Sequence, residues 1–169
     1  PEYQLSKKMQ PACDSVLCDA FGVKPSAIKR VKKGDDLFIL DSQFHIDLIL
    51  KLPNGSQLTG QEKTLSYKYA KYRTFTMEFY QNRYTKEQGE CFKIASQFYL
   101  HGYSNKDCTG FTEWRIFKVF DLINWLKRFP IASLEKRTKP AGPSRASFLQ
   151  IPYDSIPQDF VFKTSDNSK

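Results

Sequence analysis

The stretch IDLILKLPNGSQLTGQEKTL, residues 46–65, contains the clearest structural signal in the sequence. Its first part, 46–52, alternates apolar residues with others, which is the period-two pattern of a β-strand. Pro53-Asn54-Gly55-Ser56 then predicts a tight turn, because an Asn-Gly pair accepts positive φ values. A returning strand is expected over 57–65, with alternate residues on one face: Gln57, Thr59, Gln61 and Lys63. The stretch therefore predicts a β-hairpin.

The remaining pattern predicts an α/β fold built around one mixed sheet that is flanked by helices. Helices are expected at 10–21, 91–97 and 121–129, and further strands at 37–40, 74–80, 98–101 and 114–119. Beyond Pro130 the composition becomes basic and rich in turn residues. We expect a core domain at 1–130, and at 131–169 a basic linker with a C-terminal extension that packs on the core as an irregular or edge element.

Composition limits the classes of function. The chain has 169 residues, the size of one domain, and 26 Lys and Arg against 18 Asp and Glu give a net charge of +8. Such a surplus predicts a polyanionic partner, with nucleic acid favoured over an anionic membrane. No apolar run approaches the roughly 20 residues that span a bilayer, so we expect no membrane association. The four cysteines show no CxxC spacing, which indicates reduced thiols and a cytoplasmic protein. No Gly-rich phosphate loop or serine nucleophile elbow is present, which argues against nucleoside triphosphatases and serine hydrolases.

Three polar residues of the hairpin form a candidate catalytic group. Asp47 begins the first strand, and Gln61 and Lys63 lie on one face of the second. Such a hairpin brings a carboxylate, an amide oxygen and an ammonium group around one point. Carboxylate and amide oxygens bind Mg²⁺, and a bound cation polarises a phosphate and activates water. A lysine beside it can position or deprotonate the attacking water.

This layout resembles the PD-(D/E)xK nuclease superfamily, whose core is a helix, hairpin strands, a helix and a strand. In that resemblance Asp47 matches the central metal-binding aspartate and Lys63 the motif lysine. Gln61 takes the place of a second carboxylate, a variant found in the VRR-Nuc group and in a bacterial intron-encoded homing endonuclease. Gln61-Glu62-Lys63-Thr64, followed by Thr74 to Glu78, is also similar to phage and resolvase-like members. The similarity covers about residues 12–125.

The resemblance implies a restriction-endonuclease-like core and a Mg²⁺-dependent DNA endonuclease, with Mn²⁺ as a substitute, of the homing, junction-resolving or restriction type. It also implies a homodimer or homotetramer, in the cytosol of a bacterium or a phage-infected host. Asp14 on the first helix is the candidate that completes the metal and catalytic site, with Asp19 and Glu2 as alternatives. A bulge at Gly60 would instead turn Glu62 toward the metal.

Several basic residues are candidate contacts to nucleic acid. Lys68, Lys71 and Arg73 alternate with tyrosines in the segment 67–73, where lysine and arginine bind phosphates and tyrosines stack on exposed bases. The alternative for this segment is a solvated helix or loop with tyrosines facing the core. The other candidates lie in two basic stretches: Lys29, Arg30, Lys32, Lys33, Lys136 and Arg137.

Other interpretations remain open at this stage. Glu78 is assigned a structural role, and His45 and His101 are assigned to packing or phosphate contact. A non-catalytic nucleic-acid-binding module is the rival function, and a nuclease of the same fold that cuts RNA is a third.

Overall fold

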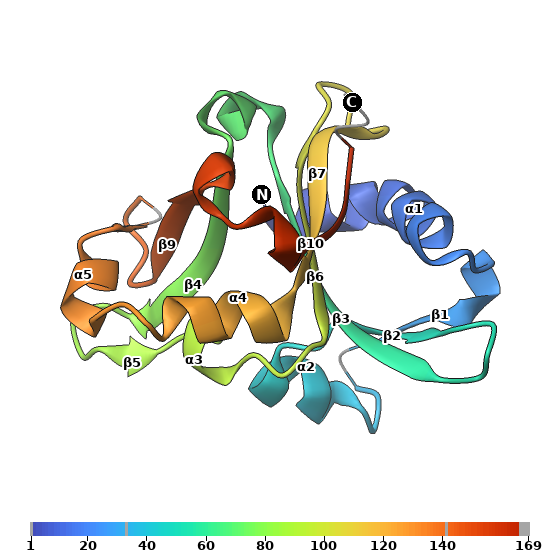
Figure 1. The fold of residues 1–169 in the computed structure, drawn as a ribbon, viewed down its shortest axis with the longest axis horizontal. Coiled ribbons are helices and arrows are strands. Elements are labelled where there is room, and N and C mark those ends of the chain that lie inside the picture. The colour runs from blue at the N-terminus through green and yellow to red at the C-terminus, as the bar shows by residue number, and fades with distance from the viewer. Residues whose placement is uncertain (1, 33, 141, 166–169) are drawn as a thin grey trace.

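The computed structural model describes residues 2–32, 34–140 and 142–165, and it contains two β-sheets with helices packed around them (Figure 1). The larger, sheet A, has six strands in the order β1-β2-β3-β6-β7-β10. Their bounds are β1 Ile28–Arg30, β2 Leu48–Lys51, β3 Gln57–Leu65, β6 Phe98–Ser104, β7 Phe111–Lys118 and β10 Val161–Thr164. The smaller, sheet B, has the order β5-β4-β9-β8, with β4 Thr74–Asn82, β5 Glu87–Gln88, β8 Thr138–Pro140 and β9 Ser147–Pro152.

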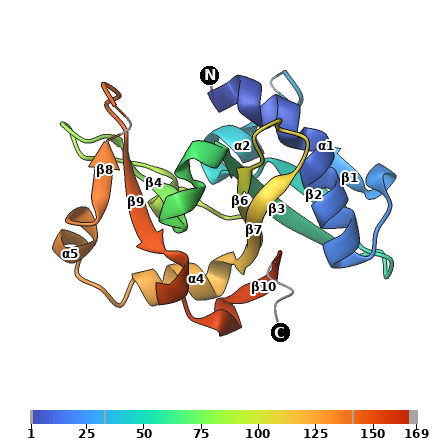
Figure 2. The ribbon, with the colours of Figure 1, turned by 90° about the horizontal axis from the view of Figure 1, so that it is seen from above.

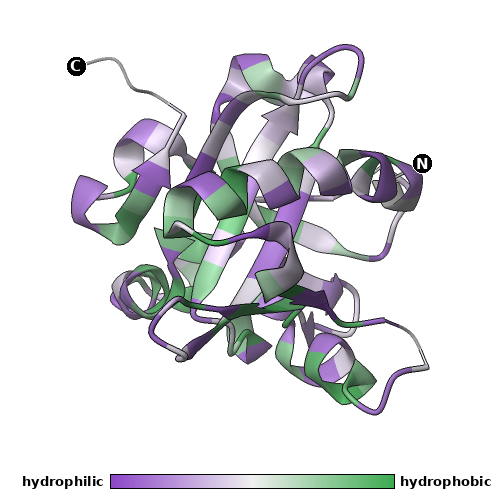
Figure 3. Ribbon diagram, turned by 90° about the vertical axis from the view of Figure 1, so that its right-hand side faces the viewer, coloured by the Kyte–Doolittle hydropathy of each residue, from purple (hydrophilic) through white to green (hydrophobic). Residues whose placement is uncertain are grey.

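Five α-helices and four short 3-10 turns connect these strands within the described ranges. The α-helices are α1 Glu2–Phe21, α2 Phe38–Phe44, α3 Glu90–Lys93, α4 Val119–Leu126 and α5 Ile131–Glu135. The 3-10 turns are η1 Pro25–Ala27, η2 Tyr67–Tyr72, η3 Tyr153–Ser155 and η4 Gln158–Phe160. Figure 3 shows α1 lying across sheet A, with hydrophilic and hydrophobic residues both present along it.

The expected hairpin is confirmed as β2 and β3, which pair antiparallel from Lys51↔Gln57 to Leu48↔Gly60. At its turn Gly55 has φ +84°, so this glycine supplies the left-handed conformation that the turn needs. The Asn54 side-chain oxygen accepts a hydrogen bond from the Ser56 amide at 3.0 Å and so closes the turn.

Strand β3 is central because it pairs in opposite senses on its two sides. It runs antiparallel to β2 and parallel to β6, and the crossover between β3 and β6 contains η2, β4, β5 and α3. The crossover thus carries half of sheet B. From above, the two lobes of the molecule lie on either side of β6 and β7 (Figure 2).

Alternation along β3 divides the core into two clusters. Paired residues of β3 and β6 on one face of sheet A, such as Gly60 and Phe98, lie under α1. Phe98 packs there in a cluster with Leu48 and Leu50. The partners on the other face include Tyr99 and Tyr103, which pack in the cluster between the two sheets. Gln61 and Lys63 therefore point into the space between the sheets, while even-numbered residues of β3 face α1.

The α/β class and a mixed sheet flanked by helices are confirmed, but some elements differ. The strand expected at 37–40 is wrong, because this region enters α2; an apolar run of that length fits either element. The C-terminal extension, which was expected to pack as an irregular or edge element, does so only in part. Strand β10 does lie at the edge of sheet A, whereas β9 is an interior strand of sheet B, between β4 and β8.

Candidate functional site

The candidate site lies where strands β2 and β3 separate. β2 pairs with β3 only as far as Gly60, so among the described strands residues 61–65 pair with β6 alone. The open edge borders a pocket of about 190 Å³. Its lining comes from α1, β3, α3 and β6: Ser6, Gln61, Glu62, Lys63, Thr64, Leu65, Glu90 and Tyr99.

Asp47 lies at the point where these two strands separate. Its backbone amide donates to the Gly60 carbonyl at 2.9 Å, and its Oδ2 accepts a hydrogen bond from the Glu62 amide at 2.9 Å. The carboxyl thus continues the β-ladder just before β2 begins at Leu48. Burial raises the pKa of Asp47 to about 8, against the lowering effect of this hydrogen bond, and the charges of Glu62 and Glu90 add to the rise.

Gln61 and Glu90 bring two unpartnered oxygens to the pocket. Gln61 Oε1 and Glu90 Oε1 are both buried, and neither has a hydrogen-bond partner among the described residues. The other oxygen of Glu90 accepts hydrogen bonds from Tyr99 Oη at 3.2 Å and from the Glu78 amide at 3.4 Å. Burial raises the pKa of Glu90, and the nearby Lys63 charge acts in the opposite direction. A side-chain hydrogen bond from Gln61 also lowers the pKa of Glu90, so these two side chains contact each other beside the pocket. Buried polar atoms are normally paired, and the two oxygens that remain unpartnered are candidate donors to a cation.

Lys63 provides the positive charge on the same face. Its Nζ lies 4.1 Å from the centroid of the Phe148 ring, which belongs to β9 of sheet B. The Lys63 charge lowers the pKa of Glu78 against a rise caused by burial and by Glu90. An ammonium group, two carboxyls and an amide therefore share this space between the sheets. Such a group can hold a hard cation and donate hydrogen bonds to an anion.

Asp14 lies in a separate cluster on the α1 face of sheet A. Arg30 donates hydrogen bonds to Asp14 and to Glu62, and a second contact to Glu62 measures 3.1 Å. Glu62 is on the opposite face of β3 from Gln61, and pairing with β6 runs without a register shift from Gly60 to Leu65. The alternative of a bulge at Gly60 is therefore wrong. The structure does not bring Asp14 together with Gln61 and Lys63.

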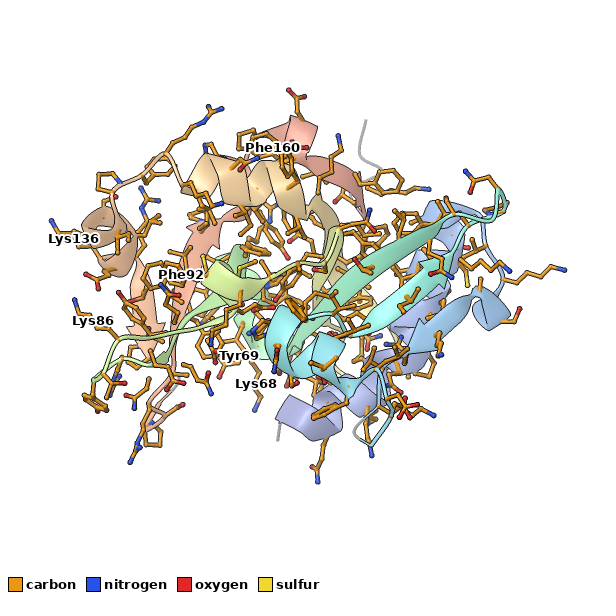
Figure 4. All side chains as sticks on the ribbon, turned by 90° about the horizontal axis from the view of Figure 1, so that it is seen from below. Lys68, Tyr69, Lys86, Phe92, Lys136 and Phe160 are labelled. Carbon is orange, nitrogen blue, oxygen red and sulfur yellow. The ribbon has the colours of Figure 1, made fainter. Side chains whose placement is uncertain are left out.

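The candidate nucleic-acid contacts differ in their exposure and in whether they form ion pairs within the protein. Arg30 is bound in the cluster just described, and Arg73 pairs with Glu113 at 2.9 Å and Asp154 at 3.2 Å. Lys33 lies outside the described residues. Figure 4 shows Lys136 at the left-hand end of the molecule and Lys68 near the middle of its lower side. The exposed candidates are Lys29, Lys32, Lys68, Lys71, Lys136 and Arg137.

Neither histidine is among the residues that line the pocket, although His101 is the β6 partner of Lys63. His101 is fully buried, accepts a hydrogen bond from the Thr76 amide at 3.1 Å and contacts Tyr153 Oη at 2.6 Å. Burial lowers the pKa of both His101 and His45. His101 is thus a neutral packing residue.

Sequence reasoning missed Glu90, which lies between the strand expected at 74–80 and the helix expected at 91–97. A usable signal was Gly89: a Cβ there would come within 2.8 Å of the Glu78 side chain, so only glycine allows α3 to begin this close to β4. Phe148 was also missed, because nothing local indicates that β9 reaches Lys63.

No group of three His, Cys, Asp or Glu side chains in the described ranges is arranged to hold a metal ion, so a cation site here would need the Gln61 amide. None of the described helices has the length and apolar character needed to span a bilayer. No known family model, curated protein or solved structure matches this chain.

Proposed function

We propose that this chain is a metal-dependent endonuclease of the PD-(D/E)xK type that hydrolyses phosphodiester bonds in DNA. The observation that carries the proposal is the pair of unpartnered, buried oxygens of Gln61 and Glu90 in a pocket that Lys63 also lines. Oxygen donors without partners, beside a cation that can contact phosphate, fit a phosphodiesterase better than a packing role.

The topology supports the same proposal. A helix, an antiparallel hairpin, a crossover and a strand parallel to the second hairpin strand occur in this order in α1, β2, β3 and β6, with β1 and α2 inserted between α1 and β2. This is the element order that the resemblance implies, except that a four-residue helix and part of a second sheet replace a long crossover helix. The site lies where β2 leaves β3, at the edge that is open to a ligand.

The residues present fit Mg²⁺. Gln61 and Glu90 offer unpartnered oxygen donors, which this hard cation prefers, and Glu90 from α3 would supply the further carboxylate that the resemblance assigned to Asp14. Asp47, which is not among the residues that line the pocket, would add the carboxyl oxygen that the Glu62 amide does not use. When bound, the cation polarises the scissile phosphate and lowers the pKa of a coordinated water. The raised pKa values of Asp47 and Glu90 mean that both carboxyls keep their protons to higher pH than exposed carboxyls do, so a cation would compete with protons for these oxygens.

The chain's own residues then have distinct tasks. Lys63, held over the Phe148 ring, donates hydrogen bonds to the attacking water or to a phosphate oxygen. Tyr99 and the Glu78 amide fix the orientation of the Glu90 carboxyl. The Glu62 amide fixes that of Asp47. Homing, junction-resolving and restriction enzymes share this chemistry, and cutting both strands of a duplex calls for two copies of the chain.

The test is cleavage of plasmid, branched DNA and RNA by the purified protein, with Mg²⁺ and with chelator. Cleavage should require the cation and fall by about 100-fold or more in Asp47→Asn and Lys63→Met. The exposed Asp107 and Lys51 provide matched controls, Asp107→Asn and Lys51→Met, which should cut at the parental rate. Parental cutting by Asp47→Asn would disprove the proposed site.

A non-catalytic nucleic-acid-binding module is the second candidate. The neutral Gln61, at the position where the resemblance places a carboxylate, favours it because an amide holds a divalent cation less strongly. This candidate predicts salt-sensitive binding without cleavage under every cation tested.

A further inference from the structure

The segment Tyr67–Tyr72, which forms η2, lies directly after the strand that carries Gln61 and Lys63. Leu65, two residues before it, lines the pocket, and the Ser66 side chain caps its first turn. Figure 4 shows Lys68 and Tyr69 projecting on the same side of the molecule as the N-terminal part of α1, to which the pocket residue Ser6 belongs. The segment thus flanks the candidate site.

Its aromatic side chains face solvent rather than the core. Tyr67, Tyr69 and Tyr72 are 38%, 55% and 59% exposed, and Ala70 is the member that packs against the core between the sheets. The alternative of tyrosines facing the core is therefore wrong. Exposing three aromatic rings within six residues forgoes the burial that usually places such rings inside a domain.

The chemistry of the segment fits one kind of occupant. Lys68 and Lys71 are exposed between the rings, and Lys71 Nζ lies 5.0 Å from the centroid of the Tyr72 ring. The segment has no acidic residue, and the chain carries a net charge of +8. Rings that alternate with cations stack on bases while the cations bind the backbone phosphates. In a duplex the base faces are covered by their neighbours, so such stacking needs unpaired nucleotides.

We propose that Tyr67–Tyr72 is a stacking platform for single-stranded nucleic acid beside the candidate site. Through this platform the proposed nuclease would act on single-stranded or branched substrates rather than on uniform duplex. The substrate class rests on the proposed function, whereas binding of unpaired nucleotides by the platform does not.

Binding without cleavage tests the platform by itself. Fluorescence anisotropy in chelator compares labelled oligo(dT), oligo(U) and a duplex of equal length, and we expect the single strands to bind about tenfold more tightly. The oligo(dT) and oligo(U) arms decide between DNA and RNA. Equal or tighter binding of the duplex would overturn the proposal.

Substitutions then locate the contact. Tyr69→Ala with Tyr72→Ala should weaken single-strand binding about tenfold or more while duplex binding changes less, and the corresponding Phe variants should keep it, since they retain the rings. Tyr84, 70% exposed at the turn between β4 and β5, provides the control Tyr84→Ala, which should bind as the parent does. Parental binding by the double alanine variant would refute the platform.

The two proposals fail in different ways. Single-strand binding without cation-dependent cleavage would remove the nuclease and leave the platform. Cation-dependent cleavage of duplex by a protein whose double alanine variant is unaffected would remove the platform and leave the nuclease.

Discussion

The ammonium group of Lys63 on β3 lies over the aromatic ring of Phe148 on β9, with 4.1 Å between Nζ and the ring centroid. This contact joins the two sheets at the candidate site. Phe148 pairs in register with Glu78 of β4, so sheet B places an aromatic face and a carboxyl against the same lysine. A cation–π contact of this kind fixes the ammonium without neutralising it.

Replacing Phe148 should therefore impair catalysis more than binding. In Phe148→Leu we expect cleavage to slow about three- to tenfold, because the ring that holds Lys63 is lost. Single-turnover cleavage at saturating DNA measures this, with DNA affinity in chelator as the control. Phe148→Trp should recover the rate since it keeps an aromatic face. An equal loss in the Leu and Trp variants would mean that Phe148 acts only through packing.

The pH dependence of stability should reveal the buried Asp47. Its folded pKa of about 8 lies above the ordinary value of 3.8, so between these values the folded state holds a proton that the unfolded state releases. The contribution of Asp47 to stability is then present below pH 3.8 and lost as pH rises toward 8, by at most about 1.4 kcal/mol per pH unit. Urea unfolding in chelator across this range measures it. Asp47→Asn should remove this part of the slope and Asp107→Asn should not; identical slopes in the parent and Asp47→Asn would contradict the prediction.

We expect Glu90 to bind a cation and, in the absence of that cation, to lower the stability of the folded protein. Glu90→Gln removes a buried carboxyl whose pKa is raised, so the cation-free protein should be at least as stable at neutral pH. The same variant should bind Mn²⁺ about tenfold or more weakly in a calorimetric titration, because a charged donor is lost. Glu87→Gln, at an exposed position nearby on β5, is the control. Unchanged Mn²⁺ affinity in Glu90→Gln would exclude Glu90 as a ligand.

Gly60 should tolerate no side chain. A Cβ there would lie 2.2 Å from the Phe98 ring, and the ring is buried under α1, so Gly60→Ala should lower the free energy of unfolding by about 1–3 kcal/mol. Gly110→Ala, whose nearest neighbour would be 3.7 Å away, is the control in the same urea experiment. Partial recovery in the double variant with Phe98→Leu would identify the ring as the cause. A neutral Gly60→Ala would show that Phe98 can move aside.

Arg30 should prove more important for stability than for nucleic-acid binding. Arg30→Met leaves Glu62 and Asp14 without their shared partner, and such a loss costs about 3–5 kcal/mol when the pair is buried; partial exposure of Asp14 places this case at the lower end. Lys29→Met, at the exposed neighbouring position, should change stability by less than about 0.5 kcal/mol. Chemical denaturation and oligonucleotide binding are measured on both. A stable Arg30→Met that binds DNA poorly would restore Arg30 as a phosphate contact.

The sequence predicted the parts of the fold that local pattern determines. Alternation and an Asn-Gly turn were sufficient for the hairpin, and with it for the common face of Gln61 and Lys63. The pairing of β4 with β9 joins residues such as Met77 and Leu149 that are distant in the chain, and nothing in either segment specifies the partner. Sheet B was missed for that reason.

Residues of the candidate site divide in the same way. Those on the hairpin could be proposed from spacing alone, whereas Glu90 reaches the pocket only because the crossover folds back over β3. The resemblance implies Asp14 as the acidic residue from the first helix, but Arg30 holds it on the other side of the sheet. Ion pairs of this kind depend on tertiary packing, which periodicity does not reveal.

The contact between Lys63 and Phe148 also has a consequence for biosynthesis. The lysine is synthesised before its aromatic partner, which belongs to the later strand β9. A nascent chain that ends before β9 therefore exposes the ammonium without its ring, and the arrangement around it is completed only after Phe148 has been made.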